Sequence, residues 1–161
     1  MANYVEEKLT PALILSSPLK RAASTAKILQ KEIGCELKFY DDLMEFNNGV
    51  LAGLSREEAL IKYPLPKGGR PVHIPIQDGE SELEFRYRAE RIFHKIILDY
   101  QDYERVAIVS HGGLISNFIK AFLKQPNGDL IFATGDTGIH LLEIREGLRL
   151  VRFTNKQEHL L

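Results

Sequence analysis

The sequence predicts an α/β fold with a mostly parallel sheet and an antiparallel hairpin at its C-terminal edge. Three observations point to this fold. Two short apolar runs, 12–15 and 106–109, are each followed at once by a helical pattern, the strand-turn-helix unit of parallel sheets. The third observation is a pair of strand-like segments, 140–144 and 148–154, joined by a turn that contains Gly147, which is typical of a hairpin.

The first unit begins with the strand 12–15, which is bounded by Pro11 on one side and by polar residues on the other. Ser17 is the expected cap of the following helix, and Pro18 suits the first helical position because no N–H group is needed there. Small and apolar residues at helical spacing carry this helix to a stop at Gly34.

The middle of the chain is expected to form a short strand, two helices and a long loop. Residues 37–40 are the second predicted strand. A Ser-x-x-Glu capping box opens each of the segments 55–63 and 81–100, so both are predicted to be helices. The loop between them, 64–79, is rich in Pro and Gly, and ordered loops of this length often act as lids.

The second unit has the clearest strand pattern. Residues 105–110 contain four consecutive apolar side chains, which is typical of a parallel strand covered on both faces. His111-Gly112-Gly113 then turns the chain into a helix with apolar residues at helical spacing.

Composition excludes several functions. The net charge of -1 offers no basic field for nucleic acid, and no apolar run approaches the roughly 20 residues of a membrane span. Cys35 is the single cysteine, so no intrachain disulfide forms and a reducing, cytoplasmic setting is expected. No His-x-x-x-His or His-Glu-x-x-His pair occurs, so we expect no metal and no other cofactor.

The 161 residues contain no linker that would divide them, and the start of the chain lacks the pattern of a secretion leader. We therefore expect one domain, 1–161.

Two predicted strand ends carry polar chemistry that suits an anion. Arg21 lies in the first turn of its helix, where unpaired N–H groups already favour negative charge. His111 follows the second strand, and Gly112 allows the backbone to approach a ligand closely. Because the carboxyl ends of parallel strands meet at one edge, Arg21 and His111 are predicted to converge on one anion although 90 positions separate them.

Each residue also has an ordinary interpretation. A single arginine near a helix start more often makes a surface ion pair, and a single histidine is more often structural. The Lys67, Arg70 and His73 side chains of the long loop are interpreted as surface charge rather than as part of a site.

Several motifs, taken in order, resemble the phosphoglycerate-mutase-like branch of the histidine phosphatase superfamily. The resemblance implies that family's three-layer sandwich over nearly the whole chain. It rests on Ser16-Ser17-Pro18-Leu19-Lys20-Arg21-Ala22 with Thr25-Ala26, on Glu45 with Gly49 and Gly53, on Gly79-Glu80-Ser81, and on Ser110-His111-Gly112-Gly113.

The resemblance implies a role for each matching residue. Arg21 corresponds to the second phosphate-binding arginine, His111 to the second histidine, and Glu45 to the acid that protonates the leaving group. Gly112 joins Arg21 and His111 as a predicted phosphate contact.

One motif of the family has no counterpart in this sequence. The family's first strand ends in Arg-His-Gly, which supplies the nucleophilic histidine and the first arginine, and no Arg-His-Gly occurs here. The expected protein is therefore an N-terminally incomplete phosphatase that lacks its first strand and turns over poorly. A missing central strand would also expose sheet edges, through which two copies could pair.

Two functions remain open from the sequence. One is a phosphatase for small phosphomonoesters that works through a phosphohistidine; the segment 45–79 is short for the lid of a cofactor-dependent mutase, which favours hydrolysis. The other is an inactive pseudo-phosphatase that binds a phosphorylated metabolite or free phosphate. An esterase is set aside because no Gly-x-Ser-x-Gly nucleophile elbow is present.

Overall fold

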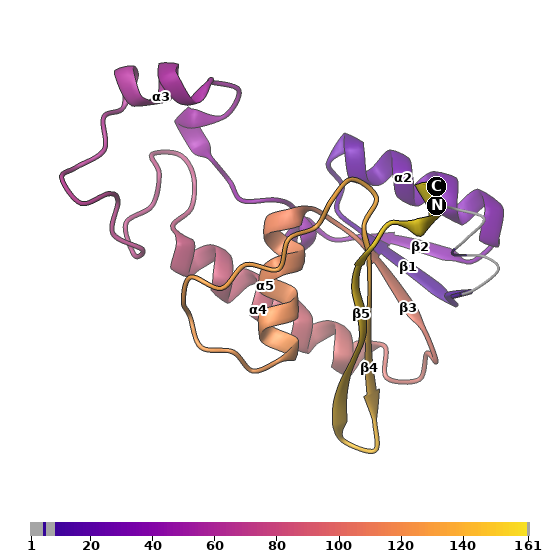
Figure 1. Cartoon of the computed structure of the whole chain (residues 1–161). Helices are drawn as coiled ribbons and strands as arrows, with labels where there is room; N and C mark the ends of the chain where they lie inside the picture. The colour runs from indigo at the N-terminus through magenta and orange to yellow at the C-terminus, as the bar shows by residue number, and fades with distance from the viewer. Residues whose placement is uncertain (1–4, 6–8, 161) are drawn as a thin grey trace.

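A three-stranded parallel sheet organises the chain (Figure 1). The computed structural model describes Val5 and residues 9–160; the expected domain limits, 1 and 161, lie outside the described residues. Strands β1 (Leu13–Ser16), β2 (Glu36–Phe39) and β3 (Val106–Val109) lie in the order β2-β1-β3. The predicted α/β fold is confirmed, with each strand within one residue of its predicted position.

Helices cover both faces of this sheet. Helix α2 (Lys20–Ile33) packs on one face through Ala26 and Leu29, which contact Ile14 of β1. Helices α4 (Glu82–Asp99) and α5 (Gly112–Phe122) cover the other face, against Leu13 and Leu15. Successive side chains of a strand point to opposite faces, so β1 contributes to both layers of the core and is fully buried.

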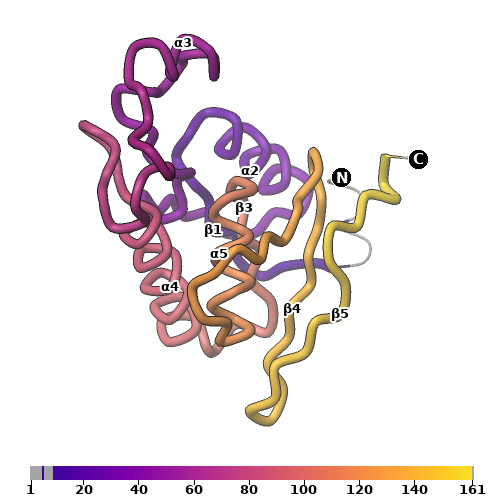
Figure 2. Tube along the Cα trace, turned by 60° about the vertical axis from the view of Figure 1, so that its left-hand side comes forward, coloured from indigo at the N-terminus to yellow at the C-terminus, as the bar shows by residue number. Residues whose placement is uncertain are grey.

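The C-terminal hairpin forms as predicted. Strands β4 (Ile139–Arg145) and β5 (Leu148–Lys156) pair in antiparallel fashion through a two-residue turn. Glu146 and Gly147 of the turn both have positive φ, at 53° and 79°, as the favoured two-residue hairpin turn requires. The two strands form a sheet of their own, which lies alongside the helices and the parallel sheet (Figure 2).

An arginine fastens the hairpin to helix α5. Arg149 of β5 donates to the carbonyl oxygens of Ala121 and Phe122, at 3.0 and 2.6 Å, and its guanidinium lies over the Phe93 ring. Both carbonyls belong to the last turn of α5, and that of Ala121 also accepts from the Lys124 N–H at 3.1 Å. Arg149 therefore binds the end of α5 and holds strand β5 against this helix.

The start of α2 was predicted wrongly. The helix begins at Lys20, its N-cap is Leu19, and no side chain caps it. Ser17 is fully buried and its hydroxyl bonds the Leu19 N–H and the His111 ring instead. The predicted end at Gly34 is confirmed, since Gly34 has φ 77° and its N–H bonds the Gln30 carbonyl.

Both predicted capping boxes are present, but their helices differ in packing. Ser81 opens α4, which buries much of one side in the core, whereas Ser55 opens α3 (Arg56–Lys62), which has no buried residue. Helix α3 and the loop after it project from the rest of the molecule (Figure 1). We call residues 51–75 the lid.

The two ends of the lid are joined at its base. The Val50 N–H bonds the Gln77 carbonyl, and the Glu80 N–H bonds the Asn47 carbonyl, both at 3.0 Å. A Cβ atom added to Gly79 would lie 2.4 Å from the Asn47 carbonyl oxygen, so only glycine fits this crossing. Short 3-10 turns, Asp41–Leu43 and Gly49–Leu51, complete the segment that leads into the lid.

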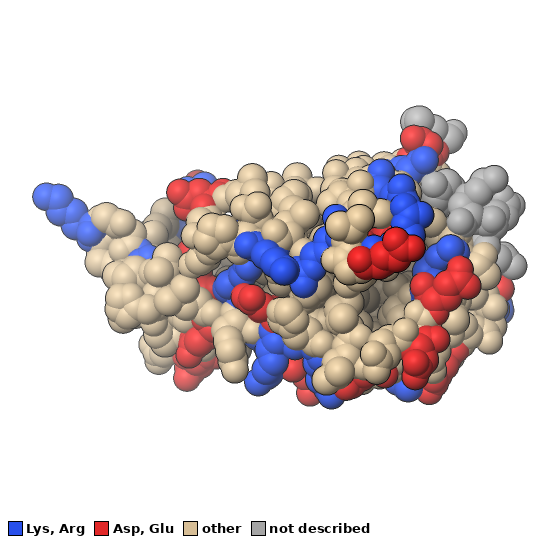
Figure 3. Space-filling model, turned by 90° about the horizontal axis from the view of Figure 1, so that it is seen from below, with Lys and Arg blue, Asp and Glu red and all other residues tan. Residues whose placement is uncertain are grey.

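The surface carries charges of both signs. Lys and Arg alternate with Asp and Glu over the face that Figure 3 shows, which agrees with the near-zero net charge. Among the described helices, none has the length and apolar character that crossing a bilayer requires.

The two capping boxes provide a paired test of this packing. We expect Ser81→Ala to lower the free energy of unfolding by about 1 kcal/mol, because the cap holds a helix that the core depends on. Ser55→Ala should leave global unfolding unchanged, because α3 contributes no buried residue. Urea unfolding followed by circular dichroism measures both, and equal losses would contradict the packing described.

Candidate functional site

Strands β1 and β3 end side by side and bring the two predicted loops together. Ser16 is paired with Val109 in the parallel register, so Ser17 and Ser110 leave the sheet at the same edge. Helices α2 and α5 begin just beyond this edge. Open α/β sheets bind ligands at such an edge.

Arg21 and His111 meet directly. Arg21 Nε donates to His111 Nδ1 at 2.9 Å. A guanidinium only donates, so Nδ1 is the acceptor and the proton of the neutral ring lies on Nε2. His111 Nε2 lies 2.9 Å from Ser17 Oγ, so the neutral ring donates to this hydroxyl. Both ring nitrogens are thus fixed, and His111 has one tautomer and one orientation.

The surroundings of His111 favour its neutral form. Burial lowers the pKa of the imidazole, the positive charge of Arg21 lowers it further, and the Glu45 carboxylate acts in the opposite direction. The residue is only 6% exposed, and burial is the largest of these effects.

Several donors at this edge have no partner among the described residues. Arg21 uses only Nε in a side-chain bond, which leaves its two terminal nitrogens available. The N-cap residues of α2 and α5, Leu19 and His111, make no side-chain bond to the first amides of their helices. Gly112 is exposed, and a Cβ atom added there would meet nothing within 4 Å. Donors in this arrangement suit an anion with several oxygens.

Glu45 lies against the start of α5. Its Oε2 accepts from the Gly113 N–H at 3.1 Å and its Oε1 from the Phe46 N–H at 2.9 Å. A Cβ atom added to Gly113 would lie 2.5 Å from Glu45 Oε1. Gly113 is therefore the glycine that packing requires, and it lets the carboxylate reach the helix that begins at His111.

A cavity of about 270 Å³ lies between the lid and the start of α4. Its walls are mostly apolar, and Phe46, the residue after Glu45, is one of them. Arg70 also lines it, whereas Lys67 and His73 are exposed. The other lining residues are Leu65, Pro71, Ile74, Ile76, Glu80, Ser81 and Glu82.

Sequence reasoning did not find two contributors to the site. Ser17 was interpreted as a helix cap, and its contact with His111 depends on a residue 94 positions away. The second is Arg88, which binds the loop that carries Glu45. A sequence signal for Arg88 does exist, because it is a charged residue beside the buried stripe of Phe85, Ala89 and Ile92.

Within Val5 and residues 9–160, no group of three or more His, Cys, Asp or Glu side chains could hold a metal ion.

Comparisons with known proteins agree on one family. The family described as "Histidine phosphatase superfamily (branch 1)" matches residues 1–157. A probable phosphoglycerate mutase, GpmB, from Salmonella arizonae is 31% identical over 118 residues, which are 70% of this chain and 54% of the relative. GpmB of Escherichia coli K12 matches with the same identity and coverage. The chain thus spans about half the length of these curated relatives.

Solved structures share the fold. The α-ribazole phosphatase from Shigella flexneri aligns with a TM-score of 0.83 and 21% identity, over 96% of this chain and 78% of that one. A mycobacterial glucosyl-3-phosphoglycerate phosphatase, solved with VO3, aligns with a TM-score of 0.78 and 22% identity, over 97% and 81% of the two chains. By its sequence match and its fold, this chain belongs to branch 1 of the histidine phosphatase superfamily.

Proposed function

We propose that this chain carries the phosphate pocket of a metal-independent phosphomonoesterase that works through a phosphohistidine. The observation that carries the proposal is the 2.9 Å bond between Arg21 and His111 at the start of two helices. Arg21 and the Gly112 amide bind the phosphoryl oxygens, and His111, once its ring has taken up a second proton, donates to them from the side. Glu45 is the acid that protonates the leaving alkoxide.

The substrate class is a small phosphomonoester, and hydrolysis is favoured over phosphoryl transfer between two positions of a substrate. The short segment 45–79 supports hydrolysis, because a longer lid would be needed to exclude water. The lid cavity is the proposed place for the leaving group. The mycobacterial phosphatase, which shares this fold, has also been solved with inorganic phosphate, which supports phosphate as a ligand to test.

The 161 residues supply only part of such a pocket. They contain no Arg-His-Gly, so the nucleophile and the first arginine of the family are not among them. We propose that these residues alone are a severely impaired phosphatase. The second candidate is a pseudo-phosphatase that keeps phosphate binding without turnover, which Arg21 and His111 would also support.

The proposed setting is one domain in the cytoplasm, with self-association through a sheet edge. Strand β3 has only β1 as a neighbour among the described strands, and its four apolar residues are half-buried. An apolar edge of this kind favours pairing with a strand of a second copy. The other free edge of the sheet, β2, carries Glu36 and Lys38, which oppose such pairing.

The first test of the proposed function is turnover and phosphate binding by the 161-residue chain. We expect hydrolysis of a general phosphomonoester on the order of 10⁴-fold or more below that of an intact relative, because loss of a nucleophile removes transition-state stabilisation. Phosphate should still raise the melting temperature slightly, by binding only the folded state. Arg21→Ala should abolish this shift.

Lys20→Ala is the matched control, because it removes a positive charge from the same helical turn without touching His111. It should keep most of the phosphate shift. Robust hydrolysis that disappears in His111→Ala would show that a histidine had taken over the nucleophilic role and would contradict the proposed impairment.

The second test follows the titration of His111 by NMR. We expect its pKa to lie below the ordinary histidine value, because the ring is buried and faces Arg21. Arg21→Ala should raise this pKa, since it removes a positive charge that opposes protonation. Bound phosphate should also raise it, because a nearby anion favours the imidazolium.

His140 is the internal control for this titration. Burial alone lowers the pKa of His140, which lies on β4 and bonds Thr134. It should respond neither to Arg21→Ala nor to phosphate. A His111 titration unchanged by phosphate would exclude the ring from the anion site.

A further inference from the structure

Arg88 of α4 binds the loop that carries Glu45 at several points. Nη1 donates to the carbonyl oxygens of Asp42 and Met44, both at 2.8 Å, and Nη2 donates to that of Glu45 at 3.2 Å. Nη2 also donates to Glu80 Oε1 at 2.7 Å, and Nε to Glu80 Oε2 at 3.3 Å. A guanidinium has five N–H groups, and each has a partner here.

This arrangement differs from a surface ion pair. The side chains of Arg88 and Glu80 are only 17% and 13% exposed, and the guanidinium lies 4.9 Å from the centre of the Phe85 ring. A charge pair removed from water is stable only when its remaining N–H groups also have hydrogen-bond partners. The three backbone carbonyls supply these partners to Arg88. Lysine, with one ammonium group, could not reach all three.

Glu80 holds the other side of the same loop. Its Oε1 also accepts from the Asn47 N–H at 2.7 Å, and its own N–H donates to the Asn47 carbonyl at 3.0 Å. The backbone is thus held on both sides of Glu45, at residues 42, 44 and 45 by Arg88 and at residue 47 by Glu80.

The Glu45 carboxylate depends on where this backbone lies. Its two bonds go to the Phe46 and Gly113 N–H groups, and Gly113 belongs to a different element, α5. A shift of the loop by about 1 Å would stretch the Gly113 bond beyond hydrogen-bonding distance. Such a shift is also enough to impair a catalytic group substantially.

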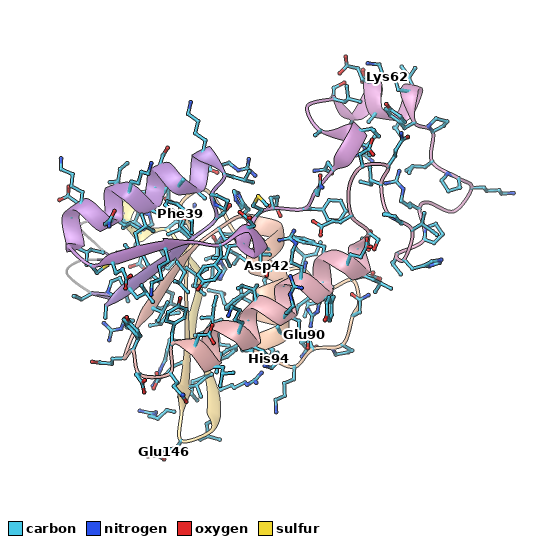
Figure 4. All side chains as sticks on the ribbon, turned by 180° about the vertical axis from the view of Figure 1, so that it is seen from behind. Phe39, Asp42, Lys62, Glu90, His94 and Glu146 are labelled. Atoms are coloured by element: carbon cyan, nitrogen blue, oxygen red, sulfur yellow. The ribbon has the colours of Figure 1, made fainter. Side chains whose placement is uncertain are left out.

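We propose that Arg88, braced by Glu80, is a positioning residue for Glu45: it fixes the loop so that the carboxylate is held against the start of α5, beside His111. The consequence for catalysis rests on the proposed role of Glu45 as the acid. Asp42 lies next to α4, so the helix and the loop are in contact along this side (Figure 4).

The first experiment observes the Glu45 bonds directly, in amide NMR spectra of the full chain. The Glu45→Gln variant serves as the reference. It shows in which direction the Phe46 and Gly113 amide proton signals move when the carboxylate is lost. Arg88→Lys keeps the charge next to Glu80 but not the three carbonyl bonds, and we expect it to move both amide signals in the same direction as Glu45→Gln.

Arg91→Ala is the matched control. Arg91 lies on the same helix and pairs with Asp42 Oδ1 at 2.7 Å, but its side chain is 53% exposed and its bond goes to the Asp42 side chain rather than to the backbone of the loop. It should leave both amide signals in place. If Arg88→Lys does not fold, Glu80→Gln, which keeps the shape of the brace and loses its charge, is expected to produce the same shifts. Unchanged signals in a folded Arg88 or Glu80 variant would overturn the proposal.

The second experiment is a double-mutant cycle on the dissociation constant of inorganic phosphate. Glu45→Gln should tighten phosphate binding about fivefold, because a carboxylate beside the anion repels it. In the Arg88→Lys background the same substitution should have almost no effect, since Glu45 is no longer held there. An equal effect in both backgrounds would show that Arg88 only stabilises the fold, and would overturn the proposal.

Absence of phosphate binding by the unmodified chain would count against the proposed function alone, and the amide spectra would still decide the role of Arg88.

Discussion

The hydrogen bond from Arg21 to His111 joins the two strand-turn-helix units on which the fold is built. It forms because β1 and β3 are direct neighbours in the sheet and end in register. The residues after Ser16 and Val109 therefore leave the sheet at the same level along the strand direction. The burial of Ser17 and the tautomer of His111 both follow from this junction. A different strand order would separate the two loops, whatever their residues.

Elements whose signals are local were predictable from the sequence. The two capping boxes, the Gly34 stop and the hairpin turn depend on residues within a few positions of each other, and all are present. The start of α2 was not predictable in this way. Ser17 and Pro18 make a strong local case for an earlier start, but the Ser17 hydroxyl bonds His111, so the competing partner is remote in sequence.

The residues of the candidate site also differ in whether their signal in the sequence is local or remote. Arg21, His111 and Glu45 could be named from the sequence because their motifs lie in recognisable loops. Arg88 is recognisable only as a charged residue beside a buried stripe, and its partners could not be named, because three of the five oxygen atoms it binds are backbone carbonyls, which any residue would supply. Its carboxylate partner, Glu80, belongs to a motif whose role the sequence did not reveal.

The charges around His111 explain how the site could respond to an anion. Burial and the charge of Arg21 lower the pKa of the ring in the free protein, and the Glu45 carboxylate only partly offsets them. A bound phosphate would neutralise the Arg21 charge and add its own negative field, so both changes favour taking up a proton. The proton would go to Nδ1, the one ring nitrogen without one, and this would displace the Arg21 Nε bond. Arg21 would then be free to turn its guanidinium to the anion, so that proton uptake by His111 and phosphate capture by Arg21 become one coupled event.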